Sequence, residues 1–155
     1  MIQRIQSLYL LLTTLLPFLF LKGTILSILN NNGSGFTMTL RGIFQTTGEQ
    51  VSELTAKPLI LQLILILITV SSVIALALFR KRRLQMKMVF IVMILAVALS
   101  GIIIYHIISL SSETHMSLIP GYRMFLPLII LLFALLAYRG IRKDEDLVKS
   151  YERLR

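Results

Sequence analysis

The chain has 155 residues, of which 56% are hydrophobic and 15% are charged, and its mean hydropathy is +0.84. This composition is too apolar for a soluble domain, and it indicates a single-domain integral membrane protein. The absence of cysteine excludes disulfides and cysteine-based chemistry. The net charge of +9 would suggest nucleic acid as a partner of a soluble protein, but in a membrane protein orientation explains it better.

The first apolar run, Ser7–Leu21, predicts a span over about 5–22. A signal peptide is the alternative, but no small-x-small cleavage site follows the run, so a retained signal anchor is favoured. Pro17 lies inside the run. Because proline lacks a backbone N–H, it predicts a kink that neighbouring helices must accommodate.

The residue pattern of the outer loop 23–57 is typical of β structure. Thr24–Leu29 is a strand candidate, Asn30–Gly35 has turn residues, and Phe36–Leu40 alternates apolar residues with threonine. These segments predict a small β-hairpin, with Ile43–Thr47 as a candidate third strand. A disordered loop is the alternative, because two short strands alone are marginally stable in water.

Three further apolar runs predict spans over 58–79, 88–110 and 122–139. Pro58 suits the first turn of its helix. The last span is short, contains Pro127, and is bracketed by Tyr122 and Tyr138 as interfacial anchors.

Most of the 16 Lys and Arg residues lie at the amino end, between the second and third spans, or after the last span. Four spans place both termini on one side, and this charge bias places that side in the cytoplasm. The run Arg80, Lys81, Arg82 and Arg83 acts as a positive-inside signal and is a candidate lipid-headgroup site. No aromatic residues interleave with it, so we expect no nucleic-acid partner.

The tail 140–155 predicts a short cytoplasmic helix with acids first and bases last, the order that the helix dipole favours. Leu147, Tyr151 and Leu154 share one face of that helix. Together with Arg153 they form a candidate partner-binding surface.

Small residues predict where the second and third spans meet, because helices in lipid associate through close backbone contact. Pairs at the required spacing are Ser71 with Ala75, and Ala96 with Ser100, which Gly101 extends. An oligomer seam is the alternative.

His106 is ionisable and lies inside a predicted span, which makes it a candidate intramembrane polar site. It could approach Glu113 and His115 and form a ligand set of the types that zinc accepts, but the spacing matches no metal motif and a solvated loop is favoured. Residues expected to hydrogen-bond between helices are Gln62, Thr13 and Thr14.

The sequence holds no phosphate-binding glycine loop, no HExxH motif, no nucleophile with a plausible base and no carboxylate inside a span. We therefore expect no enzyme activity and no catalytic, cofactor-binding or metal-binding residues. The leading hypothesis is a non-catalytic structural or accessory subunit that binds another membrane or cytosolic protein, or itself, through its cytoplasmic ends. A small transporter or channel, alone or as an oligomer, is the alternative.

The ends of the chain carry a more specific pattern. The opening MIQRIQSLYLLL and the closing IRKDEDLVKSYERLR resemble the signatures of a family of short bacterial four-span inner-membrane proteins, catalogued as a domain of unknown function. The resemblance covers the whole chain. It implies a bacterial inner membrane and no established activity, substrate or cofactor.

These expectations combine into one fold. We expect an all-α integral membrane domain over 1–155, built as a four-transmembrane-helix bundle. It would carry a small extracytoplasmic β-hairpin in the first loop and a short cytoplasmic C-terminal helix.

Overall fold

The computed structural model describes residues 2–21, 23–29, 35–47, 50–54, 58–79, 81–112 and 117–153. The helices are α1 (Ile2–Leu15), η1 (Leu16–Phe20, 3₁₀), α2 (Leu59–Ala77), α3 (Arg82–Ser112), η2 (Tyr122–Phe125, 3₁₀) and α4 (Leu126–Arg153). The strands are β1 (Thr24–Leu29), β2 (Gly35–Thr39), β3 (Ile43–Thr47), β4 (Gln50–Leu54) and β5 (Ser117–Pro120). The chain is thus mostly helical with one small sheet.

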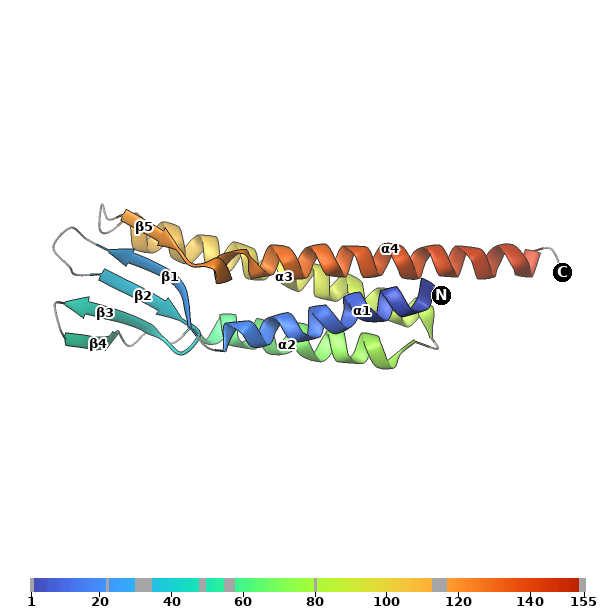
Figure 1. The fold of residues 1–155 in the computed structure, drawn as a ribbon, viewed down its shortest axis with the longest axis horizontal. Coiled ribbons are helices and arrows are strands. Elements are labelled where there is room, and N and C mark those ends of the chain that lie inside the picture. The colour runs from blue at the N-terminus through green and yellow to red at the C-terminus, as the bar shows by residue number, and fades with distance from the viewer. Residues whose placement is uncertain are drawn as a thin grey trace.

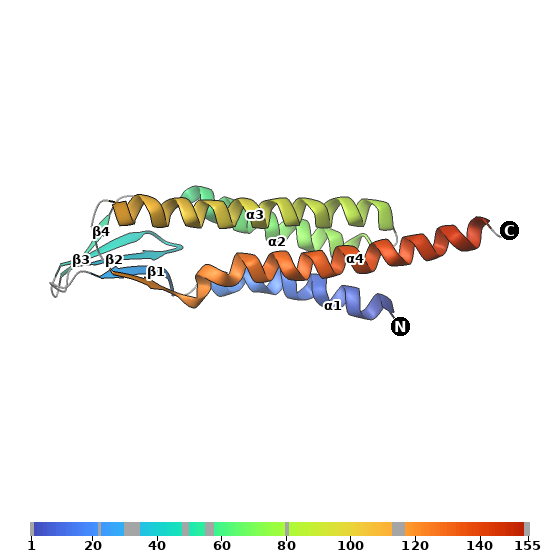
Figure 2. The ribbon, with the colours of Figure 1, turned by 90° about the horizontal axis from the view of Figure 1, so that it is seen from above.

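The helices lie side by side, with the sheet at one end and both chain termini at the other (Figure 1). We call these the sheet end and the terminal end. Helix α1 packs against α2 and α4, and α3 packs against the same two neighbours. Figure 2 shows the same arrangement from above, with α4 reaching beyond the other helices at the terminal end.

Three helical segments of the described chain are long and apolar enough to cross a membrane: Leu59–Ala77, Arg82–Ser109 and Tyr122–Asp146. They correspond to the second, third and fourth predicted spans. The first predicted span contains a shorter apolar helical segment, Ser7–Phe20. Many large apolar side chains on the outer faces of these segments are exposed, as a lipid environment requires.

Buried residues recur on the helices in alternating steps of three and four. The clearest sets are Leu61, Leu65, Ile68, Ser72 and Ala75 on α2, then Val89, Val92, Ala96, Leu99 and Ile103 on α3, then Ile130, Ala134, Ala137 and Ile141 on α4. This heptad spacing places one narrow stripe of each helix toward its neighbours, as in left-handed helical bundles. Hydropathy averaged over a span does not reveal it.

The small-residue prediction for the second and third helices holds only in part. Ala75 and Ala96 are fully buried in the common core. On α2, however, the fully buried serine is Ser72 rather than Ser71. Gly101 faces outward, and a Cβ added there would meet no neighbouring atom within 4 Å, so it takes no part in close helix contact.

Pro17 ends the α-helical part of the first span. Helix α1 stops at Leu15, and the chain continues as the 3₁₀ helix η1 with Pro17 buried near its start. The missing N–H and the proline ring disfavour further α-helix, and a tighter turn accommodates both. The predicted kink is therefore a change of helix type.

The sheet has five antiparallel strands in the order β4-β3-β2-β1-β5. The predicted strands at Thr24–Leu29 and Ile43–Thr47 are present with those bounds, and the predicted second strand is shifted by one residue to Gly35–Thr39. The hairpin prediction was incomplete, because β4 and β5 were not expected. Strand β5 comes from the connection between α3 and α4 and pairs with β1, where Ser27 lies opposite Ile119.

The carboxyl-terminal segment does not form a separate short helix. Helix α4 runs without interruption from Leu126 to Arg153. Gly140 lies inside it, at a cost of about 1 kcal/mol relative to alanine, and no proline follows. The buried stripe of α4 continues through Ile141 to Asp144, so packing outweighs the glycine.

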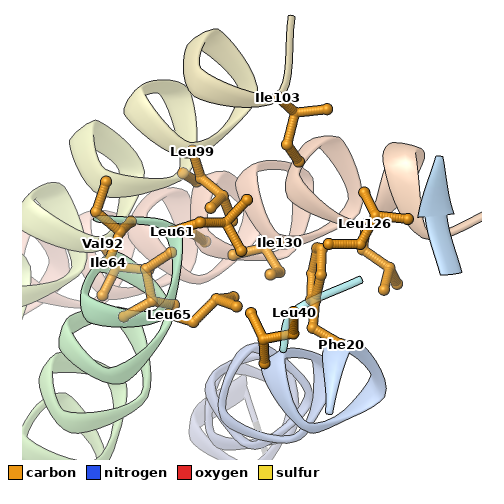
Figure 3. Close-up of a cluster of buried hydrophobic side chains, with 14 of the residues drawn as sticks. Phe20, Leu40, Leu61, Ile64, Leu65, Val92, Leu99, Ile103, Leu126 and Ile130 are labelled. Atoms are coloured by element: carbon orange, nitrogen blue, oxygen red, sulfur yellow. The ribbon is translucent and has the colours of Figure 1, made fainter. Parts of the chain in front are cut away.

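The core is continuous with the sheet end. Phe20 of η1, Leu40 of the β2–β3 turn and Leu126 at the start of α4 approach one another beside α2 and α3 side chains (Figure 3). Phe20 is fully buried and Leu40 nearly so. The sheet is therefore attached to the helices through apolar contacts as well as through the chain.

Candidate functional site

Two ion pairs join α3 to α4 at the terminal end. Arg82 Nη1 lies 2.8 Å from Asp144 Oδ2, and Arg83 Nε lies 3.2 Å from Glu145 Oε1. The contact between Arg82 and Asp144 is an ion pair but not a hydrogen bond, since Asp144 Oδ2 has no hydrogen-bond partner. The Arg83 contact is also a hydrogen bond. Both carboxylates are buried while Arg83 is largely exposed.

These pairs explain why a basic cluster is tolerated at the start of a helix. Cations at a helix amino end oppose the helix dipole, and α3 has no acidic residue in its first turn to offset them. The acids of α4 supply the compensating charge. Of the predicted headgroup site, Arg82 and Arg83 are thus engaged within the molecule, Lys81 is exposed, and Arg80 lies outside the described residues.

Beyond the ion pairs, α4 continues into a free end, and Figures 1 and 2 both show it projecting past the other helices. The predicted partner-binding residues belong to this end. The backbone of Leu147, Tyr151 and Arg153 is helical, their side chains lie outside the description, and Leu154 lies outside the described residues altogether. Their common face remains a prediction.

His106 lies in the last two turns of α3 and is half-buried. Its ring contacts the edge of the Tyr105 ring at a centroid distance of 5.8 Å, and Tyr105 itself is 68% exposed. Glu113 and His115 lie outside the described residues. Within the described residues, no group of three or more metal-ligand side chains comes together.

The length of α3 bears on the depth of His106. Its 31 residues extend about 46 Å at 1.5 Å per residue, which exceeds the roughly 30 Å of a hydrocarbon core. The last turns of α3 run level with the sheet in both views (Figures 1 and 2). His106 therefore belongs to the part of α3 nearest the sheet.

Arg123 forms a clamp at the sheet end that was not predicted from the sequence. Its Nε donates a hydrogen bond to the Leu19 carbonyl at 2.9 Å, and its Nη1 donates to the Thr24 carbonyl at 3.4 Å. The guanidinium also lies 4.4 Å from the centre of the Tyr122 ring. One side chain thus ties η1, β1 and η2 together.

Two glycines leave room for this junction. Gly23 has a φ of 108°, and a Cβ there would overlap the Arg123 guanidinium. A Cβ at Gly121 would lie 2.7 Å from the carbonyl oxygen of Ile25. One feature of the sequence could have indicated the clamp. Arg123 is a single arginine at the start of the last apolar run, at the end of the molecule that has few basic residues.

The turn between β2 and β3 is fixed to α2. Thr39 N donates to the Gly42 carbonyl at 2.9 Å, which closes the turn. Gln62 Nε2 then donates to the Leu40 carbonyl at 2.7 Å. The expected inter-helix hydrogen bond of Gln62 is therefore made to the sheet instead.

Thr13 and Thr14 also differ from expectation. The Thr13 hydroxyl contacts the carbonyls of Tyr9 and Leu10, and the Thr14 hydroxyl donates to Leu10. All these acceptors lie one turn earlier in α1. Both hydroxyls are therefore satisfied within their own helix, as threonine commonly is in membrane helices.

A groove of about 660 Å³ lies beside the β2–β3 turn, between η1 and the first half of α2. We call it the η1–α2 groove and define it by Pro17, Phe18, Arg41, Gln62, Ile66 and Val70. Its walls are mostly apolar, and Arg41 is the charged residue among those that line it. Phe18, Ile66 and Val70 are exposed, so the groove opens sideways.

The two ends of the molecule present different surfaces. The terminal end offers the free end of α4 beyond a charge-paired junction. The sheet end offers the η1–α2 groove beside a fixed hairpin turn. Between them, the described core is a continuous apolar cluster that includes residues from all four α-helices.

A family model described as a domain of unknown function, DUF4293, matches residues 2–154. No curated protein matches the chain, and no solved structure does either. The family match covers both patterned ends as well as the sheet-forming loops.

Proposed function

Since the chain belongs to the DUF4293 family, a domain of unknown function, we propose a role from the geometry: a non-catalytic multi-pass membrane protein that binds another protein through the free end of α4. The projection of α4 beyond the other helices carries this proposal. Most helical stability in proteins comes from tertiary contacts, and the backbone of this end lies past the other helices of the described chain. A partner would supply those contacts.

The proposal places four spans in a bacterial inner membrane with both termini in the cytoplasm. Helix α1 and η1 together extend about 30 Å, enough to cross the hydrocarbon core as a fourth span. The common location of both termini supports an even number of crossings. The excess of Lys and Arg at the terminal end supports a cytoplasmic location for that end.

The interior favours this role over a small transporter or channel. The described buried residues are apolar apart from Thr13, Ser72, Gln85 and the two acids of the ion pairs. The Thr13 hydroxyl bonds within its own helix. A conducting path needs a hydrated polar lining, and the described core has an apolar one.

The absence of cysteine permits a direct test. We would place one cysteine at Lys149, on the free end of α4, attach a photoreactive crosslinker in native membranes, and identify adducts by mass spectrometry. A matched cysteine at Phe90, exposed on the outer face of α3, serves as control. We expect a discrete protein adduct from Lys149→Cys and none from Phe90→Cys.

A truncation separates binding from folding. Ending the chain after Asp146 keeps Asp144 and Glu145, so both ion pairs remain. We expect this variant to fold and to lose the partner on purification in mild detergent. A homogeneous free monomer from the unchanged chain, with no adduct at Lys149→Cys, would refute the proposal.

A further inference from the structure

The η1–α2 groove has the features of a site for a single lipid molecule. Its volume of about 660 Å³ falls within the range of small-molecule pockets, about 300–1,000 Å³. Pro17 contributes to its shape, because the chain narrows from α-helix to 3₁₀ helix there. The groove therefore forms where the first span departs from regular α-helix.

Two polar side chains on the α2 wall of the groove already donate hydrogen bonds within the chain. Gln62 donates to the Leu40 carbonyl at 2.7 Å, and the Thr69 hydroxyl donates to the Leu65 carbonyl at 2.9 Å. The remaining lining on α2 is apolar, and Ile66 and Val70 are exposed along it. An apolar chain can enter such a groove without leaving wall groups unpaired.

Arg41 gives the groove a charged mouth. It is exposed at the β2–β3 turn, whose position is fixed by the bond between Gln62 and the Leu40 carbonyl. Among the side chains that the structure describes, no acidic group pairs with Arg41. A guanidinium so placed matches a phosphate, which it can bind through two parallel hydrogen bonds.

The length of the groove selects among occupants. It runs along α2 from Gln62 to Val70, about 12 Å of helix. The hydrocarbon core is about 30 Å thick, so a groove of this length fits within one leaflet, which is the part of the membrane that a single lipid occupies. A short apolar groove with one cationic side chain at its opening suits a lipid with an anionic headgroup.

We propose that the η1–α2 groove holds one anionic phospholipid from the leaflet at the sheet end, with its phosphate on Arg41 and an acyl chain between η1 and α2. The proposal shares the membrane placement given above, and it is independent of the partner-binding role of α4.

The test uses the full chain in mild detergent, mixed with micelles that contain phosphatidylglycerol or, in parallel, phosphatidylcholine. Native mass spectrometry counts the lipids that the protein retains. We expect one retained phosphatidylglycerol molecule. Retention of phosphatidylglycerol should exceed that of phosphatidylcholine about fivefold, because one cationic side chain favours an anionic headgroup by about that factor. Equal retention of the two lipids by the unchanged chain would overturn the proposal.

Two variants separate the headgroup from the chain. Arg41→Gln removes the charge, so we expect the preference for phosphatidylglycerol to disappear. Val70→Trp fills the channel, so we expect lower retention of both lipids. Both positions are exposed and should tolerate substitution. Arg142→Gln, at an exposed arginine near the terminal end, is the matched control and should keep the preference. Wild-type retention by both Arg41→Gln and Val70→Trp would contradict the site.

A third measurement identifies the occupant in membranes. Ile66→Cys carries a photoreactive label into the groove, and we expect adducts with phosphatidylglycerol. A discrete protein adduct at this position, from a second copy or another protein, would overturn the lipid proposal. The crosslinking test of the partner proposal probes the end of α4 and not the groove. Failure of the lipid proposal is therefore distinguishable from failure of the partner proposal.

Discussion

The two ends of the molecule are joined by different kinds of interaction. At the sheet end, backbone hydrogen bonds unite β1 with β5, and Arg123 ties together segments far apart in the sequence. At the terminal end, two ion pairs connect α3 to α4. Backbone hydrogen bonds are directional, whereas the exposed side chain of Arg83 makes its pair with the buried Glu145 sensitive to salt.

This difference assigns separate tasks to the two ends. At the sheet end, the β1–β5 pairing, the Arg123 clamp and core contacts hold the elements together, so changes to these contacts should act on folding. The terminal end leaves one helix free, so changes there should act on association. The following substitutions test that division, in order of decreasing expected effect on stability.

Gly121→Ala should cause the largest loss. Its Cβ would meet the carbonyl oxygen of Ile25 at 2.7 Å, and that atom belongs to the backbone of β1. We expect a destabilisation of about 2–3 kcal/mol, typical of overpacking at a fixed contact. Denaturant titration in mild detergent, followed by circular dichroism, measures it.

Gly101→Ala is the matched control for that substitution. The added Cβ meets no atom within 4 Å, and alanine improves helix propensity by about 0.5–1 kcal/mol. We therefore expect a small gain in stability. Equal losses from the two substitutions would show that the β1 junction is not a tightly packed contact.

Arg123→Met should come next, with a loss of about 2 kcal/mol. The carbonyls of Leu19 and Thr24 lose a charged donor, and the contact with the Tyr122 ring is lost as well. Hydrogen exchange should rise in β1 and β5 and stay unchanged where α3 meets α4. Faster exchange at both ends would argue against a local clamp.

Arg82→Gln and Arg83→Gln test the terminal end. Asp144 keeps only 8% of its side chain exposed, so loss of Arg82 leaves a buried carboxylate unpaired, and we expect about 1 kcal/mol of destabilisation. Glu145 is nearly as buried, with 11% of its side chain exposed, but Arg83 is 80% exposed and its charge is screened by water, so its removal should cost less, about 0.5 kcal/mol. Thermal melts at low and high salt measure both. A larger loss from Arg83→Gln would reverse this assignment.

Ending the chain after Asp146 should have the smallest effect on stability, within about 0.5 kcal/mol. The removed segment belongs to the projecting end of α4. The same melts measure it. A substantial loss would mean that the tail packs against the chain and is not free for a partner.

Hydropathy and turn chemistry predicted much of the fold. Apolar runs located the three long helices, and short strand candidates next to turn residues located the strands at Thr24–Leu29 and Ile43–Thr47. The alternation of apolar residues with threonine located β2 to within one residue. These features are local, so a short window of sequence contains their cause. The heptad stripes are also present in the sequence, but they are hidden because both faces of a membrane helix are apolar.

The remaining features depend on distant partners. Strand β5 has four residues ending in Pro120, and it exists because β1 offers it an edge. Arg123 and Arg41 are both isolated cations in the sequence, yet one closes a junction and the other lines a groove. Asp144 and Glu145 suggested a helix start, whereas they pair with α3 in the middle of a longer helix.

The pairing of β1 with β5 has a consequence for biosynthesis. Strand β1 leaves the ribosome long before β5, and until then one of its edges presents unpaired N–H and C=O groups, a form prone to wrong pairing. In the proposed four-span topology, strand β5 can reach that edge only after α2 and α3 have been inserted and the chain has returned to the same side. In that topology, completion of the sheet marks a chain in which α2 and α3 have been inserted and α4 is still to follow, and a chain arrested earlier displays the open edge.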